Sequence, residues 1–519
     1  AAAEVGERIR AHVRIDERAA AFTALGLSRH DPTHPAAVVT TSGTATAHLH
    51  AAVMEAHHSR IPLLVLTADR PAELREVGAN QTTRQAGMFR SLARLAVDLP
   101  APTADSATAL ELRTAVSTAA RALAAATGEH PGPVHLNLSF RDPLVPRPDS
   151  EAPAEDAVVS RQRIVLTRRL GSPPAPPYPV VVAGDGAGQA AVALSARHQL
   201  PLLAEPSSGA RHGETLIPGY PALLREVMAD PSHPLRPRRA IVFGHPTLSR
   251  PVVGALLGAE DVEVIVVDPQ LDWADVARRA RLVVPAVVGE EQEPVAAGAR
   301  QEHLAAWRAA ADTATAALAT SWQQRAALAV WEASGSEDVL VLGSSSLVRD
   351  LEQHAGPTAA RVIANRGLSG IDGTTAMAGG LALAREAGSA DGASPTTLGR
   401  TGGGPGRIRL LVGDLTALHD LTGLLIGPEE PRPALDVIVV DDGGGRIFSG
   451  LEHADAPPAL LRRFFTTPHG ADLAAAAAAL GAEALRVTED SLPGALAGSS
   501  DGLRVLVVQP TSSADSRDS

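Results

Sequence analysis

The sequence predicts an α/β protein built from three doubly wound parallel-sheet domains. Short apolar runs, typical of strands buried on both faces, alternate with helical stretches along the chain. The length of 519 residues is enough for two to four domains. A stretch rich in Pro and Ser at 142–177 indicates a linker. We expect the following organisation: domains at 1–145, 178–300 and 336–519, a linker at 146–177 and a helical connector at 301–335.

The first domain alternates predicted strands and helices, which is the pattern of a parallel sheet with crossover helices. Strands are expected at 9–15, 36–43, 61–71 and 132–140. Helices are expected at 16–29 and 44–59, with a long helical stretch between the last two strands.

The other two domains follow the same pattern. Strands of the middle domain are expected at 180–183, 239–245 and 262–269. Those of the last domain are expected at 338–346, 361–367, 407–415, 436–444 and 503–510, and the Ala-rich stretch 471–485 is expected to be a packed helix.

The composition excludes several classes of function. A formal charge of −12 argues against a nucleic-acid partner, and no apolar run is long enough for a membrane span. The chain has no cysteine, and all 46 basic side chains are arginine. Thiolate sites, Schiff-base lysines and P-loops are therefore excluded, and an anionic substrate must be held by guanidinium groups. No signal peptide is recognisable, which favours a cytoplasmic location.

Two glycine-containing segments are candidate cofactor sites. "GDGAG" at 184–188 resembles a dinucleotide-binding turn, but no acidic residue ends a second strand about 20 residues later, so a plain strand-to-helix turn is favoured over a nicotinamide site. The second segment is "VGDLT", followed one βα unit later by "VIVVDDGGG". Asp414 and Asp442 would both lie at the carboxyl edge of a parallel sheet. Two carboxylates and a glycine carbonyl suit Mg²⁺, and the helix after Asp414, with the Thr416 hydroxyl, would face a diphosphate.

This spacing of GD and a second acid resembles the signature of thiamine-diphosphate enzymes, which also need a glutamate on a separate domain. Longer stretches resemble one family of them. They are "DERAAAFTALGL", "TSGTATAHLHAAVMEAHHSRIPLLVLTADRPAELREVGANQTTRQAGMF", "SSSLVRDLE", "ANRGLSGIDG", "GDLTALHDL" and "DDGGGRIFSGLE". In this order they resemble the 2-succinyl-5-enolpyruvyl-6-hydroxy-3-cyclohexene-1-carboxylate synthases (MenD) of menaquinone biosynthesis.

The resemblance implies a transferase that decarboxylates 2-oxoglutarate and adds the remaining four-carbon unit to isochorismate. The implied cofactors are thiamine diphosphate and Mg²⁺, with Mn²⁺ as a substitute. Glu17 would bond to the pyrimidine ring, and Ile371 would hold the cofactor in its bent shape. The diphosphate and the metal would be held by Gly413, Asp414, Leu415, Thr416, Asp442 and the carbonyl of Gly444.

The substrate residues implied by the resemblance are mostly arginines. Ser345, Arg349 and Arg366 would face 2-oxoglutarate, and Arg250 would add a further cation. Isochorismate would lie between polar residues, Arg70, Asn80 and Gln81, and apolar residues, Ile447, Phe448 and Leu451. We expect Arg70, Arg349 and Arg366 at strand or loop ends. Both substrates are dicarboxylates, which accords with this use of arginine.

The chain also departs from the family pattern. We find no counterpart of the family's first strand, which ends in a Ser-Arg pair that binds isochorismate, so the first domain is expected without that segment. Asp442 replaces a common amide, and His48 stands where Asn is frequent. In this superfamily the two halves of the cofactor site come from different subunits, which predicts a homodimer or homotetramer. The alternatives are another thiamine-diphosphate carboligase or decarboxylase, and a non-catalytic truncated homologue.

Overall fold

The computed structural model describes residues 9–103, 107–142, 144, 179–270, 272–287, 297–316, 318–390, 406–450, 452–498 and 502–511. Two compact units are present. Unit 1 contains Ala1–Arg169, Gly367–Thr396 and His419–Ala434, and unit 2 contains Leu170–Arg366, Thr397–Leu418 and Leu435–Ser519. Each is described by itself.

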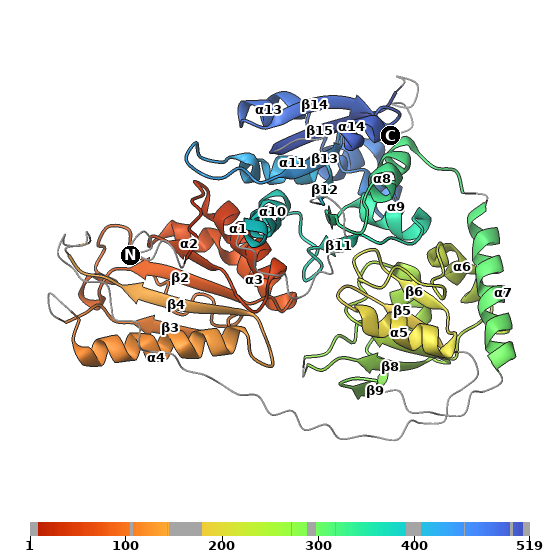
Figure 1. Cartoon of the computed structure of the whole chain (residues 1–519), viewed down its shortest axis with the longest axis horizontal. Coiled ribbons are helices and arrows are strands. Elements are labelled where there is room, and N and C mark those ends of the chain that lie inside the picture. The colour runs from red at the N-terminus through yellow and green to blue at the C-terminus, as the bar shows by residue number, and fades with distance from the viewer. Residues whose placement is uncertain are drawn as a thin grey trace. The chain divides into compact units, whose positions relative to one another are not determined.

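Unit 1 is built on a parallel sheet of order β1-β2-β4-β3 (Figure 1). Its strands are β1 (Ala37–Thr40), β2 (Leu63–Asp69), β3 (Leu95–Leu99) and β4 (Pro133–Ser139). Its helices and helical turns are α1 (Glu17–His30), α2 (Thr44–His48), α3 (His50–His58), η1 (Ala72–Leu74), α4 (Ala109–Ala126), α10 (Thr374–Ala390) and η3 (Leu421–Leu424).

Helix α1 begins where the sequence predicts, because Asp16 caps it by accepting the N–H groups of Arg18 and Ala19. Small residues allow α1 to approach α10 closely. A Cβ atom on Gly26 would lie only 2.1 Å from the carbonyl oxygen of Met377, so this contact requires glycine.

One predicted strand of unit 1 is wrong. Residues 9–15 form no strand, and Ile9, Val13 and Ile15 are exposed. Apolar and polar residues alternate here, but the polar side chains of His12 and Arg14 are the buried ones. They lie 4.0 and 3.7 Å from a carboxylate oxygen of Glu430. Conversely, the long stretch that we expected to be only helical contains β3 as well as α4.

The first half of unit 2 is a parallel sheet of order β6-β5-β7-β8-β9. Its strands are β5 (Val180–Ala183), β6 (Leu202–Ala204), β7 (Arg239–Phe243), β8 (Glu263–Val267) and β9 (Ala280–Val284). The helices here are α5 (Gln189–His198), α6 (Tyr220–Val227), η2 (Pro251–Leu256) and α7 (Ala297–Ala316). β6 and β9 were not predicted.

The second half of unit 2 is a parallel sheet of order β11-β10-β12-β13-β15-β14. Its strands are β10 (Val339–Leu342), β11 (Arg361–Ala364), β12 (Ile408–Gly413), β13 (Leu435–Val440), β14 (Glu483–Thr488) and β15 (Leu503–Gln509). The helices are α8 (Trp322–Glu332), α9 (Ser346–His354), α11 (Asp414–His419), η4 (Arg446–Gly450), η5 (Glu452–Asp455), α12 (Pro458–Leu461), η6 (Arg462–Thr466), α13 (Leu473–Ala479) and α14 (Leu492–Ala497).

The predicted Ala-rich helix is only partly correct, since α13 ends at Ala479 and β14 begins at Glu483. The predicted class of three parallel sheets with interleaved helices is confirmed. Strands β12, β13 and β15 form the centre of the last sheet, and every residue of β13 is buried. Within the described residues no helix has the length and hydropathy of a membrane span. The expected linker at 146–177 lies outside the described residues.

Candidate functional site

The carboxyl edge of the last sheet gathers three potential metal ligands. β12 and β13 are parallel neighbours with Gly413 opposite Val440, so the residues that follow them lie side by side. Asp414 follows β12 and Asp441 follows β13. One oxygen of each, together with a ring nitrogen of His469, lies within 4.8 Å of the others. The strand register therefore places a cluster of potential metal-binding atoms at the carboxyl edge of the sheet. This is the edge at which parallel sheets bind small molecules and cofactors.

The charges at this edge are not balanced. Burial and the nearby charge of Asp414 raise the pKa of Asp442 to about 7. Burial also raises the pKa of Asp414, and Asp441 adds to the effect. The guanidinium of Arg446 is shared, since its Nε lies 3.4 Å from Asp442 and its Nη2 lies 2.6 Å from Asp350. The excess of carboxylates fits a divalent cation bound through oxygen atoms.

Two of the glycines after β13, Gly444 and Gly445, are packed closely against the backbone. A Cβ atom on Gly444 would lie 2.5 Å from the carbonyl oxygen of Thr466, and the same oxygen accepts the N–H of Gly445 at 2.7 Å. The carbonyl of Gly444, a predicted metal ligand, accepts the N–H of Arg446 at 3.0 Å. The structure thus brings Asp414 near Asp442, with Gly444 two residues further along, and adds Asp441 and His469, which the sequence analysis did not single out.

The predicted diphosphate residues surround the start of α11. Gly413 ends β12, the N–H of Leu415 donates to Asp414 Oδ1 at 2.6 Å, and Thr416 is buried. Helix α11 has only six residues. Diphosphate binding by these residues stays a prediction.

Two arginines of unit 2, Arg250 and Arg366, lie within electrostatic range of a third, Arg349. Burial lowers the pKa of Arg349, and the charges of Arg250 and Arg366 lower it further. Arg366 is buried after β11 and donates to Thr247 Oγ1 at 2.8 Å. Ser345 is the N-cap of α9. The prediction that Arg349 lies at a strand or loop end is wrong, since it lies inside α9, where the turn after the cap directs it toward this group.

Behind these arginines lies a buried polar cluster that the sequence analysis missed. Arg211 donates to the carbonyl oxygens of Leu351 at 3.3 Å and Glu352 at 3.1 Å, and thereby stabilises the C-terminal end of α9. The hydroxyl of Tyr220 donates to the Glu352 carboxylate. Glu205 accepts the N–H of Leu248 at 2.9 Å, and burial together with Glu352 raises its pKa to about 8. A single sequence offers no signal for these contacts, because the partners are far apart in the chain.

The predicted apolar wall is only partly described. The rings of Phe448 and Phe465 are 5.5 Å apart, and Ile447 is half-buried. Leu451 lies outside the described residues.

Unit 1 holds Glu17 and Ile371. Glu17 is the first residue of α1, and the neighbouring Arg18 donates to the carbonyl oxygen of His419 at 2.9 Å. His419 lies 3.8 Å from Asp372, which follows Ile371. The loop that leads to Ile371 is held by Glu55, whose two oxygens accept the N–H groups of residues 367 and 368 at 3.1 and 3.0 Å. Glu55 is a buried acid that the sequence analysis missed.

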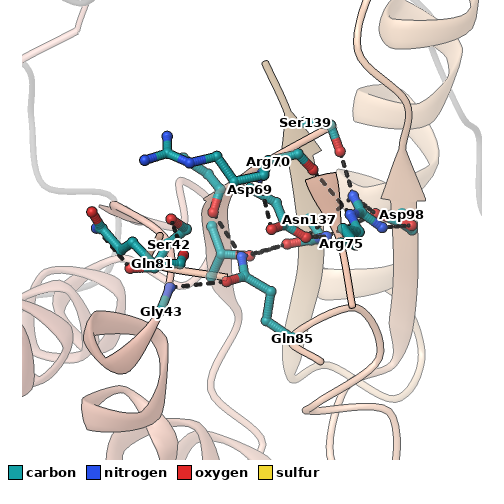
Figure 2. A network of polar contacts seen from close by, with 12 residues as sticks. Ser42, Gly43, Asp69, Arg70, Arg75, Gln81, Gln85, Asp98, Asn137 and Ser139 are labelled. Atoms are coloured by element: carbon teal, nitrogen blue, oxygen red, sulfur yellow. Dashed lines mark hydrogen bonds and ion pairs between the residues drawn. The ribbon is translucent and has the colours of Figure 1, made fainter. Parts of the chain in front are cut away.

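The predicted isochorismate residues of unit 1 adjoin a polar network (Figure 2). Gln81 donates to Thr41 Oγ1 and to the carbonyl oxygen of Ser42, both at 3.0 Å. The backbone N–H of Arg70 donates to Asp69 at 2.8 Å, whereas its guanidinium extends away from the network and has no hydrogen-bond or ion-pair partner among the described residues. Asn80 is exposed. Gln81 and the Arg70 guanidinium are therefore accessible to a ligand of unit 1.

The glycines of "GDGAG" have a structural reason. A Cβ atom on Gly184 would lie 2.1 Å from the backbone nitrogen of Pro246, and Asp185 forms a β-bridge with His245. The turn approaches the protein's own backbone closely, as the favoured interpretation of this segment requires.

Comparisons with known proteins define the class. Residues 1–88 match the family described as "Thiamine pyrophosphate enzyme, N-terminal TPP binding domain". The fold is shared with a solved structure of benzoylformate decarboxylase from Polynucleobacter necessarius, with a TM-score of 0.64 and 17% identity over 98% of this chain and 93% of that one. The chain is thus a thiamine-diphosphate enzyme.

Curated relatives define the family within this class. The 2-succinyl-5-enolpyruvyl-6-hydroxy-3-cyclohexene-1-carboxylate synthase of Kineococcus radiotolerans is 44% identical over 96% of this chain and 87% of that protein. Those of Leifsonia xyli and Thermobifida fusca are 43% and 41% identical, over 96% and 98% of this chain and 89% and 90% of theirs. The chain belongs to the family of 2-succinyl-5-enolpyruvyl-6-hydroxy-3-cyclohexene-1-carboxylate synthases, as the sequence motifs predict.

Proposed function

We propose that this chain decarboxylates 2-oxoglutarate and adds the remaining four-carbon unit to isochorismate, with Mg²⁺ or Mn²⁺ as the metal. The observation that best supports the substrate class is the group of Arg250, Arg349 and Arg366 in unit 2, where burial and then the charges of the other two arginines lower the pKa of Arg349. Guanidinium groups held together against repulsion suit an anion with more than one carboxylate.

The roles of the residues follow from their positions. Bound thiamine diphosphate would supply the carbanion chemistry. Asp414 and Asp442, with the Gly444 carbonyl, would hold the metal, and Glu17 would bond to the pyrimidine ring. Arg349 and its neighbours would bind the 2-oxoglutarate carboxylates.

Isochorismate would be held by Arg70, Asn80 and Gln81, whose accessible polar groups lie in unit 1. Residues from both units are needed for this reaction. We propose a homodimer or homotetramer in which these two sets of residues meet.

The test is isochorismate consumption by this chain with 2-oxoglutarate, with and without thiamine diphosphate and Mg²⁺. Consumption that requires all three additions supports the proposal. Arg349→Met should raise the KM for 2-oxoglutarate on the order of 100-fold, because a charge-assisted bidentate contact contributes about 2–3 kcal/mol. Turnover of pyruvate in place of 2-oxoglutarate would instead support another carboligase. In that case Arg349→Met should leave the KM for pyruvate unchanged.

A further inference from the structure

His469 lies beside the proposed metal site on a loop between η6 and α13. Its side chain is 13% exposed, and its Nε2 lies 3.1 Å from Oδ2 of Asp414, which is itself 2% exposed. The ring is therefore close enough either to bind the cation or to orient the carboxylate that does. These two roles require different tautomers.

The tautomer follows from the second ring nitrogen. The backbone N–H of Ala471 donates to His469 Nδ1 at 2.9 Å. A backbone amide nitrogen can only donate, so Nδ1 uses its lone pair and carries no proton. The neutral ring then carries its proton on Nε2, which donates to Asp414 Oδ2.

This arrangement leaves no free lone pair on the imidazole. For Nε2 to bind a metal, the proton would have to move to Nδ1, and the hydrogen bond from Ala471 would be lost. Asp414 is in a different position, because its Oδ1 accepts the Leu415 N–H at 2.6 Å and its Oδ2 accepts from His469. Each carboxylate oxygen therefore retains a lone pair for a cation.

We propose that His469 is not a metal ligand but a positioning residue, which donates from Nε2 to Asp414 and orients this carboxylate. The inference rests on the proposed function, since it assumes that Asp414 binds the metal.

The test is pulsed electron paramagnetic resonance of the Mn²⁺- and thiamine-diphosphate-loaded protein labelled with ¹⁵N-histidine. We expect no ¹⁵N coupling of the size that a directly bound imidazole gives. Such a coupling would overturn the inference and leave the metal site intact. If the protein bound no Mn²⁺ with the cofactor present, the proposed metal site itself would be wrong.

Two matched variants test the donor role. His469→Gln retains an N–H donor of similar reach, whereas His469→Phe retains a ring of similar breadth without one. We expect His469→Phe to weaken Mn²⁺ binding about 10-fold or more, and His469→Gln to retain most of the affinity, because outer partners of metal ligands typically contribute 10–100-fold. Equal weakening in both variants, or none in His469→Phe, would overturn the proposal. Urea unfolding of the metal-free variants separates these effects from a loss of fold.

Discussion

Two sheet edges carry clusters of acidic residues, and the described residues differ in how they balance them: two acids of unit 1 share one guanidinium, whereas the unit 2 carboxylates have a guanidinium, that of Arg446, which also pairs with Asp350. In unit 1, Asp69 and Asp98 share the guanidinium of Arg75, with distances of 3.1 and 2.7 Å, and Asn137 Nδ2 donates to both at 2.8 and 2.7 Å (Figure 2). The hydrogen bond from Arg75 lowers the pKa of Asp98. At the corresponding edge of unit 2, burial and the charge of Asp414 raise the pKa of Asp442 to about 7.

The presence of a shared cationic partner distinguishes a network that is satisfied within the protein from an edge that suits a bound cation. Carboxylates at the carboxyl ends of parallel strands lie close together in both units, so position alone does not decide their role. What decides it is whether a neighbouring cation within the protein satisfies them. Among the described residues, the unit 1 edge has its own guanidinium, whereas the unit 2 edge has an excess of carboxylates that suits the metal ion we propose there.

The largest expected effect is at the unbalanced edge. Asp414→Asn should reduce metal-dependent isochorismate consumption on the order of 1,000-fold, because a metal ligand is lost. The same variant, measured by urea unfolding in a chelator, should be at least as stable as the wild type, since burial of this carboxylate raises its pKa. A metal-free Asp414→Asn protein that is less stable by about 2 kcal/mol would show that Asp414 is structural, as Asp69 is.

At the unit 1 edge, by contrast, removal of a charged partner should lower the free energy of unfolding. Arg75→Met leaves Asp69, whose side chain is 1% exposed, without its cation. We expect a loss of about 2–4 kcal/mol in the free energy of unfolding, because breaking a buried pair leaves an uncompensated charge. Asp98→Asn is the matched control and should cost less, since the Asp98 side chain is 42% exposed. A loss below about 1 kcal/mol for Arg75→Met would mean that solvent already satisfies the network.

Glu205 is a buried acid outside the proposed metal site, and its raised pKa favours the protonated, neutral carboxyl group. Its pKa is raised to about 8 by burial and by Glu352, from an ordinary 4.5, so the folded protein retains a proton that the unfolded chain releases. The free energy of unfolding should therefore fall as pH rises from about 4.5 to 8, with a slope of at most about 1.4 kcal/mol per pH unit from this group. Glu205→Gln should remove that part of the slope in urea unfolding between pH 5 and pH 8. An unchanged slope would show that Glu205 is ionised in the folded state.

The sequence predicted the centre of each sheet better than its edges. β8, β12 and β13 each contain a run of three or four apolar residues, and their positions were correctly predicted. The four strands that were missed, β3, β6, β9 and β14, all lie at sheet edges. β6 has only three residues, and the others carry exposed or half-buried positions, so the apolar signal is weak.

Some residues of the candidate site could likewise be predicted from the sequence, and others could not. Asp414 and Asp442 could be predicted because a strand end fixes where they lie. His469, Glu205 and Glu55 could not be, because their partners are distant in sequence and only the folded chain brings them together. The strand predicted at 9–15 failed for a related reason, since Glu430 draws His12 and Arg14 inward.

The smallest effect is expected for an exposed ion pair. This comparison tests whether the unit 1 network contributes to the free energy of unfolding because it is buried or merely because its charges are paired. Arg84 and Glu76 lie 2.8 Å apart, as close as the pairs of the buried network, but their side chains are 85% and 63% exposed. Water competes for both groups, so Arg84→Met should change the free energy of unfolding by no more than about 0.5 kcal/mol. The measurement is urea unfolding beside Arg75→Met under the same conditions. Similar losses in both variants would mean that the two pairs contribute alike, and burial would then not explain why the unit 1 network contributes to stability.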